Sequence, residues 1–97
     1  MRPSEALAKH RDEVLEIISR YPVSNPRVFG STARGEDVEG SDLDILVDPQ
    51  FNVTTFIDLA NLEIKLEALL GIDVDVRTPG EFGKRASARV AADIRSL

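Results

Sequence analysis

The sequence has 97 residues and contains no cysteine, no tryptophan and only one histidine. Without cysteine the protein can form no disulfide, no thiolate zinc site, no iron–sulfur cluster and no thiol nucleophile. One histidine leaves almost no material for a histidine-rich metal site or a Ser-His-Asp triad. That residue, His10, lies at the edge of a predicted apolar helix stripe, so we expect it to have a structural role.

The sequence also lacks long apolar segments and an excess of basic residues. No segment approaches the roughly 20 apolar residues that span a bilayer, and the first residues lack the apolar core of a signal peptide. Twelve Lys and Arg against 17 Asp and Glu give a net charge of −5. We therefore expect a cytoplasmic protein that has no membrane contact and no direct nucleic-acid binding.

The hydrophobic content of 42% is enough for a packed core. No repeat or linker divides the sequence, and its length predicts a single domain over residues 1–97. Apolar residues at helical spacing predict helices over residues 4–21, 55–70 and 84–97. Short apolar runs predict strands over residues 27–29, 41–48 and 72–77. This order predicts an α/β (α+β) fold, a small mixed sheet flanked by helices.

Residues at the ends of these segments predict where the helices begin and end. Ser4 is the expected N-cap of the first helix and Pro22 its stop, with a connector over residues 22–26. Thr55 and Asp58 resemble a capping box, and Gly71 suits the end of the second helix. The basic residues after Pro79 fit either a docking surface or a solvated helix face, and we favour the solvated face.

Two carboxylates on one strand are hard to explain as ordinary surface. Asp42 and Asp44 are two residues apart, so both point to one face with Cα atoms roughly 6.5 Å apart. Their repulsion grows where water is excluded, and Leu46, on the same face, indicates that this face becomes covered further along. A bridging cation would relieve the repulsion. Oxygen ligands without Cys or His favour Mg²⁺ or Mn²⁺.

A later strand repeats the pattern with Asp73 and Asp75. If this strand lies beside the first, one of the two acids completes a cluster of three carboxylates. An ordinary edge strand with a solvated polar face is the alternative, and the pattern of this strand alone does not decide between them.

A glycine-rich segment precedes the acids. Gly30 and Ser31 leave a strand and lead into an expected helical turn over residues 32–35. The free N–H groups at the start of such a turn and the Ser31 hydroxyl suit an anion, and Arg34 is within reach of a phosphate. The segment is neither a Walker A loop nor a G-x-G-x-x-G fingerprint. Followed by an acid pair, it describes a site for a metal–nucleoside triphosphate.

Three motifs together resemble a known family. They are Gly-Ser-Thr-Ala-Arg-Gly at residues 30–35, Ser-Asp-Leu-Asp at 41–44 and Leu-Gly-Ile-Asp-Val-Asp-Val-Arg-Thr at 70–78. The sequence is similar to the minimal nucleotidyltransferases (MNT domains) of the DNA polymerase beta-like nucleotidyltransferase superfamily. The resemblance implies the catalytic palm of that superfamily in reduced form. It also implies that Asp75, rather than Asp73, is the third acid.

The resemblance further implies the chemistry of the site. Asp42, Asp44 and Asp75 would be the catalytic acids and bind magnesium, with two ions expected and Mn²⁺ possible. ATP would be the substrate, bound through four residues: Gly30, Ser31, Arg34 and Ser41.

The family context implies a partner. Minimal nucleotidyltransferases pair with HEPN ribonuclease toxins, which they neutralise as antitoxins by transferring AMP from ATP to a tyrosine of the toxin. Two alternatives stay open: an inactive antitoxin that works by binding alone, and a nucleotidyltransferase for a small-molecule or RNA acceptor.

Overall fold

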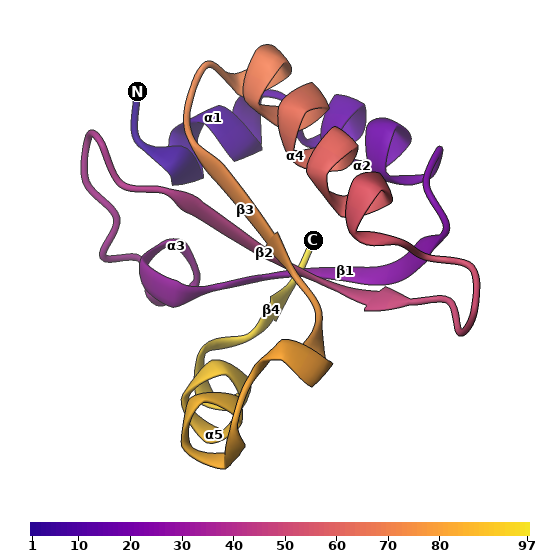
Figure 1. The fold of residues 1–97 in the computed structure, drawn as a ribbon. Helices are drawn as coiled ribbons and strands as arrows, with labels where there is room; N and C mark the ends of the chain where they lie inside the picture. The colour runs from indigo at the N-terminus through magenta and orange to yellow at the C-terminus, as the bar shows by residue number, and fades with distance from the viewer.

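The computed structural model describes all 97 residues and shows a four-stranded mixed sheet in the order β3-β2-β1-β4 (Figure 1). Strands β1 and β2 are antiparallel, β2 and β3 are parallel, and β4 is antiparallel to β1. Helices α1, α2 and α4 lie on one side of the sheet, and α5 lies on the other. This confirms the expected mixed sheet flanked by helices. The elements are α1 (Pro3–Lys9), α2 (Arg11–Ile18), β1 (Val23–Phe29), α3 (Gly30–Arg34), β2 (Leu43–Pro49), α4 (Phe56–Leu70), β3 (Val74–Arg77), η1 (Pro79–Glu81), α5 (Lys84–Asp93) and β4 (Arg95–Ser96).

The hydrophobic core lies between the sheet and helices α1, α2 and α4. Alternate residues of β2 and β3 point into it, because successive side chains of a strand face opposite ways. The apolar residues at helical spacing in this segment predict a buried stripe of Phe56, Leu59, Leu62, Leu66 and Leu69 on α4. Leu62 and Leu66 are completely buried. The prediction is wrong at Phe56, which is 83% exposed, because this residue lies in the first turn and faces water. The strand residues of the core are Val28, Leu43, Ile45, Val47, Val74 and Val76.

The caps of α4 are as predicted. The Thr55 side chain accepts the Asp58 N–H, and the Asp58 carboxylate accepts the Thr55 N–H in return. Gly71 ends the helix with φ +69°, a left-handed conformation that glycine adopts without strain. No helix in the structure has both the length and the apolar character needed to cross a membrane.

The first predicted helix is in fact two helices that meet at His10, where the backbone has φ −117° and ψ 23°. Ser4 is not the N-cap, because α1 begins at Pro3 and the Ser4 N–H donates to the Asp37 carboxylate at 2.8 Å. The second half ends at Ile18, before Pro22. Asp37 is only 3% exposed, so this contact with a distant loop holds α1 in its own orientation. Helix periodicity alone cannot show such a break.

The predicted connector over residues 22–26 was also wrong, because β1 begins at Val23. Its two prolines suggested a loop. Pro26, however, lies where the register with β2 shifts, next to Asn25 with φ +51°. A bulge of this kind accommodates a proline within a strand.

The last predicted helix is too long, because α5 ends at Asp93 and the following residues form β4. Arg27 is the register partner of Ser96, and the Leu97 N–H donates to the Pro26 carbonyl at 3.1 Å. This strand exists because the edge of β1 is available to pair with it. The weak local pattern of the segment gives no sign of that pairing.

Two glutamates of α4 accept hydrogen bonds from the backbone N–H groups at the outer edge of the sheet. Strand β3 is an edge strand, and unpaired edge N–H groups invite pairing with other chains. The Val74 N–H donates to Glu67 Oε2 at 3.1 Å, and the Val76 N–H donates to Glu63 Oε1 at 2.8 Å. The edge that carries Asp75 is therefore held in place by side chains of the preceding helix.

We expect Glu63→Ala and Glu67→Ala each to lower the free energy of unfolding by about 1 kcal/mol, because each leaves a half-buried N–H without its acceptor. Urea denaturation measures the change. Glu13→Ala is the matched control, since this exposed glutamate bonds only to the neighbouring His10 ring. Equal effects of the three substitutions would contradict the assigned role of the edge contacts.

Candidate active site

Strand pairing brings Asp44 and Asp75 side by side. Asp44 is the register partner of Asp75 across the parallel β2–β3 pair and of Phe29 across the antiparallel β1–β2 pair. Adjacent strands are about 4.8 Å apart, so the two acids share one face of the sheet at short range. Asp42 lies two residues before Asp44, just ahead of β2, and is exposed. The three predicted acids thus meet at the beginning of β2.

The charges around Asp44 are unbalanced. Partial burial, followed by the negative charges of Asp75 and Asp42, raises the pKa of Asp44 to about 6. Arg77 and Arg34 oppose this rise only in part. None of the three acids takes part in any of the eight ion pairs of the protein. The site therefore carries repulsion that a bound cation would relieve.

Gly30 is the residue that allows a close approach to Asp44. A Cβ atom at this position would lie 2.5 Å from Asp44 Oδ2, closer than real Cβ contacts. Its φ of +72° is also in the left-handed region, which disfavours other residues. The positive φ therefore favours glycine, and any larger residue would also displace the half-buried Asp44 carboxylate.

A helical turn follows β1 as the sequence predicted, but α3 begins at Gly30 itself and not at Thr32. Its N-cap residue is Phe29, which has no side chain that can cap the helix. The first N–H groups of α3 therefore have no side-chain acceptor, and Ser31 adds a hydroxyl next to them. These donors lie beside Asp44, so an anion and a carboxylate-bound cation can be held in adjacent positions.

Arg34 and Ser41 are engaged elsewhere in this structure. The Arg34 guanidinium donates to Glu36 Oε2 at 3.1 Å and to Asp93 Oδ2 at 2.8 Å, which ties α3 to α5. The Ser41 hydroxyl accepts the Val38 N–H at 3.0 Å. Neither side chain is hydrogen-bonded to Asp44, and their role toward the nucleotide stays a prediction.

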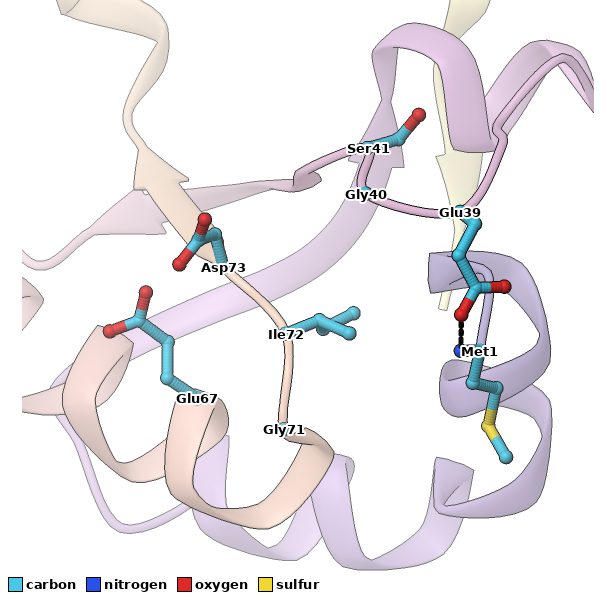
Figure 2. A pocket seen from close by; sticks show the side chains of 8 residues that line it. All are labelled: Met1, Glu39, Gly40, Ser41, Glu67, Gly71, Ile72 and Asp73. Atoms are coloured by element: carbon cyan, nitrogen blue, oxygen red, sulfur yellow. Dashed lines mark hydrogen bonds and ion pairs between the residues drawn. The ribbon is translucent and has the colours of Figure 1, made fainter.

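Asp73 faces a different space from Asp75. It lines an open hollow of about 600 Å³ together with Glu67, Ser41 and the Met1–Glu39 ion pair. In Figure 2 the Met1–Glu39 pair lies on one side of this hollow, and Asp73 and Glu67 lie on the other. Three carboxylates against one ammonium group make the hollow a poor site for a triphosphate, so its size does not mark it as the nucleotide site.

The face of the sheet that carries Asp44 is covered further along by the C-terminal segment. Leu46 is only 2% exposed although it lies outside the main core. The ring of Phe82, after η1, packs edge-on against Phe29 with centroids 5.7 Å apart. The cover over Leu46 was expected from the sequence. The aromatic pair was not, because nothing in the local pattern of the tail connects Phe82 to a strand 53 residues earlier.

The residues fit a hard divalent cation. No three acidic or histidine side chains surround one point closely enough to hold a metal by themselves. Mg²⁺ does not require this, since it usually binds one or two carboxylates and completes its shell with substrate phosphates and water. Asp42 and Asp44, with Asp75 adjacent, supply oxygen donors of that kind beside the free N–H groups of α3.

Comparison with known proteins agrees with this geometry. Residues 7–96 match the family described as Nucleotidyltransferase domain. The protein belongs to this nucleotidyltransferase family. The match spans all three motifs identified in the sequence.

Similar proteins within the family are named protein adenylyltransferases. This nucleotidyltransferase is 44% identical over 70 residues to the protein adenylyltransferase MntA of Thermococcus cleftensis, covering 72% of this chain and 67% of MntA. It is 42% identical over 74 residues to MJ0126 of Methanocaldococcus jannaschii, provisionally assigned as a protein adenylyltransferase, covering 76% of this chain and 71% of MJ0126.

Solved structures share the fold. One, provisionally assigned as a minimal nucleotidyltransferase, is 38% identical, has a TM-score of 0.83, and is matched over 97% of this chain and 95% of that chain. The fold also recurs in a crystal structure of a toxin–antitoxin with AMP-PNP, at 21% identity and a TM-score of 0.74, over 88% of this chain and 69% of that chain. The expected minimal nucleotidyltransferase fold is thereby confirmed.

Proposed function

We propose that residues 1–97 form one minimal nucleotidyltransferase domain that transfers AMP from ATP, with Mg²⁺, to a tyrosine hydroxyl of a HEPN ribonuclease toxin and so acts as its antitoxin in the cytoplasm. The observation that carries the proposal is the position of Asp44, flanked by Gly30 on one side and Asp75 on the other. The name of the relative MntA, a protein adenylyltransferase, supports a protein acceptor.

The proposed transfer needs no reactant other than ATP and the acceptor hydroxyl, and this chain supplies the group that takes up the proton. The acceptor oxygen attacks the α-phosphorus of ATP, the bond between the α-phosphorus and its bridging oxygen breaks, and pyrophosphate leaves. Asp75 receives the proton of the hydroxyl, while Gly30 and Ser31 hold the triphosphate through N–H and hydroxyl donors. Asp42 and Asp44 would hold magnesium, which would neutralise the negative charge of the phosphates. No covalent protein intermediate is needed, which suits a protein without cysteine.

An exposed apolar surface supports a protein partner. Most of the exposed large apolar side chains lie between residues 51 and 64, in the β2–α4 loop and on α4: Phe51, Val53, Phe56, Ile57 and Ile64. Concentrated exposed apolar surface is typical of protein interaction sites. Four of these residues, Phe51, Val53, Phe56 and Ile57, follow the end of β2 away from Asp44, so a partner held there leaves the nucleotide site open.

The proposal is tested with labelled ATP, Mg²⁺ and a HEPN ribonuclease toxin of the kind proposed as the partner. We expect label on the toxin, a loss of roughly 100-fold or more in transfer with Asp75→Asn, and little loss with Asp73→Asn. The two substitutions are matched, because both change an aspartate to asparagine on the same edge of the sheet. A larger loss with Asp73→Asn would contradict the assignment of Asp75.

The same assay separates the alternatives. Protection of cells from the toxin that survives the double variant Asp42→Ala and Asp44→Ala would favour an antitoxin that works by binding alone. Label on an RNA or a small molecule, and none on the toxin, would favour a different acceptor.

Magnesium should also stabilise the folded protein. Because the carboxylates repel one another only when folded, we expect millimolar Mg²⁺ to raise the thermal midpoint by roughly 2–5 °C, and further with ATP. Scanning calorimetry at constant ionic strength measures the shift. The double variant Asp42→Asn and Asp44→Asn should show none. An equal shift in this variant, or no shift in the wild type with or without ATP, would contradict the metal site.

A further inference from the structure

Helix α5 is packed loosely against the rest of the protein. It lies on the side of the sheet opposite α1, α2 and α4 (Figure 1), and none of its residues is buried. An open hollow of about 160 Å³ lies between Leu46 of β2 and the α5 residues Val90 and Ala91, so the packing under the helix is incomplete. Few buried apolar contacts are typical of the parts of a protein that move at low cost in free energy.

One side-chain contact fastens α5 to the rest of the protein. Arg34 of α3 donates to Asp93 Oδ2 at 2.8 Å, and Asp93 is the last residue of α5. The other side-chain hydrogen bond of α5 is local, from the Ser87 hydroxyl to the Phe82 carbonyl. No other ion pair includes a residue of this helix. The position of α5 relative to α3 therefore depends on Arg34.

Arg34 is also the residue of α3 that the sequence predicts to bind a phosphate, and its place on the helix suits that role. It follows Gly30 by four residues, so both lie on the same face of α3. Side chains of a helix tilt toward its N-terminus. The positive charge of Arg34 already opposes the rise in the pKa of Asp44. Rotation of the Arg34 side chain would thus bring its guanidinium to a triphosphate held at Gly30.

The two uses of Arg34 compete. Its guanidinium also donates to Glu36 Oε2 at 3.1 Å, so two carboxylates surround one positive charge in this structure. A phosphate beside the same guanidinium would be repelled by both carboxylates. The side chains of Arg34 and Asp93 are 42% and 23% exposed, and ion pairs near water contribute little to stability. A triphosphate, which carries several negative charges, can therefore displace Asp93.

We propose that the triphosphate of a bound nucleotide takes Arg34 from Asp93 and so releases α5 from α3, an inference that rests on the proposed nucleotidyl transfer. Both ends of the segment stay attached, because Phe82 packs against Phe29 and β4 pairs with β1. This pairing involves only two residues of β4, so α5 pivots without detaching. Its release widens access to the face of the sheet that carries Asp44, and the protein acceptor meets this wider opening after ATP has bound.

The first test measures the movement of α5. The chain contains no cysteine, so Ala92→Cys on α5 and Lys65→Cys on α4, both at exposed positions, can carry a pair of spin labels. Double electron–electron resonance reports the distance between the labels. We expect the distribution to shift and broaden when Mg²⁺ is added with ATP or with inorganic triphosphate. Asp93→Asn in the labelled protein should give the broadened distribution without any ligand.

Calorimetric titration of the same labelled protein separates the outcomes. Binding of ATP without a change in the distance distribution would overturn the release of α5 and leave the proposed nucleotidyl transfer standing. A change with ATP but none with bound inorganic triphosphate would also overturn it, because the phosphates would not be the cause. Binding of neither compound would overturn both the release and the proposed function.

The second test measures the competition for Arg34. Because Asp93→Asn removes the competing carboxylate, we expect it to tighten the binding of inorganic triphosphate about two- to fivefold. Asp12→Asn is the matched control, since it makes the same change of charge at an exposed residue of α2, and it should leave the affinity unchanged. Circular dichroism establishes that both variants are folded. Equal affinities of the two variants, or weaker binding by Asp93→Asn, would overturn the proposal.

Discussion

Replacing Asp44 with asparagine should abolish nucleotidyl transfer and, at the same time, stabilise the folded protein at pH 7. Transfer should fall by roughly 100- to 1,000-fold, because a ligand of the divalent cation and its charge are lost. Stability should rise because the raised pKa of Asp44, about 6, means that folding forces an ionised carboxylate into a partly buried site beside Asp75 and Asp42. We expect a gain of about 1–2 kcal/mol, less than the full pKa difference implies, since water still reaches the group.

The gain should depend on pH in a defined direction. In the unfolded chain Asp44 titrates near its ordinary pKa of 3.8, and in the folded protein near 6. As the pH falls through 6, the folded state therefore takes up a proton that the unfolded state does not, and the wild type gains stability. The difference between Asp44→Asn and the wild type should shrink from pH 7 to pH 4.

Urea denaturation of both proteins in chelator-containing buffer, at several pH values, measures this trend. A lower stability of Asp44→Asn at pH 7 would mean that the carboxylate is favourably placed without a cation. Such a result would contradict the repulsive cluster on which the metal assignment rests.

Replacing Gly30 with alanine should damage both folding and activity. The added methyl group would lie 2.5 Å from Asp44 Oδ2, and the residue would keep a φ of +72°. Left-handed backbone costs about 1–2 kcal/mol for a residue other than glycine, and the added methyl group would push the end of the Asp44 side chain out of its position. We expect a loss of about 1–2 kcal/mol in the free energy of unfolding from the backbone strain, together with loss of transfer because the Asp44 carboxylate must move.

Gly35 provides the matched control. It has the same φ of +72°, but a Cβ atom there would meet nothing within 4 Å. Gly35→Ala therefore reports the backbone strain alone, at about 1–2 kcal/mol, and should leave transfer largely intact. Similar losses of activity in the two variants would show that contact between Gly30 and Asp44 is not the reason for the glycine.

Local patterns predicted the parts of the fold that depend on nearby residues. The capping box of Thr55 and Asp58 formed as expected because its partners are three residues apart. The period of two in β2 correctly placed Leu46 on the face of Asp44, opposite the core residues. Elements that depend on distant contacts were missed. Helix α1 is set apart by Asp37, and β4 forms only because β1 offers a free edge.

The sequence by itself determined the chemical character of the site. Asp42, Asp44, Gly30 and Ser31 follow from spacing and residue type, since the side-chain period of a strand and the freedom of glycine are local properties. Which of Asp73 and Asp75 adjoins Asp44 was decided physically only by the tertiary structure, because the register of two parallel strands depends on the helix that joins them and on its packing. The engagement of Arg34 by Asp93 and the contact of Phe82 with Phe29 likewise arise where the C-terminal segment packs against the sheet, a contact that no local pattern encodes.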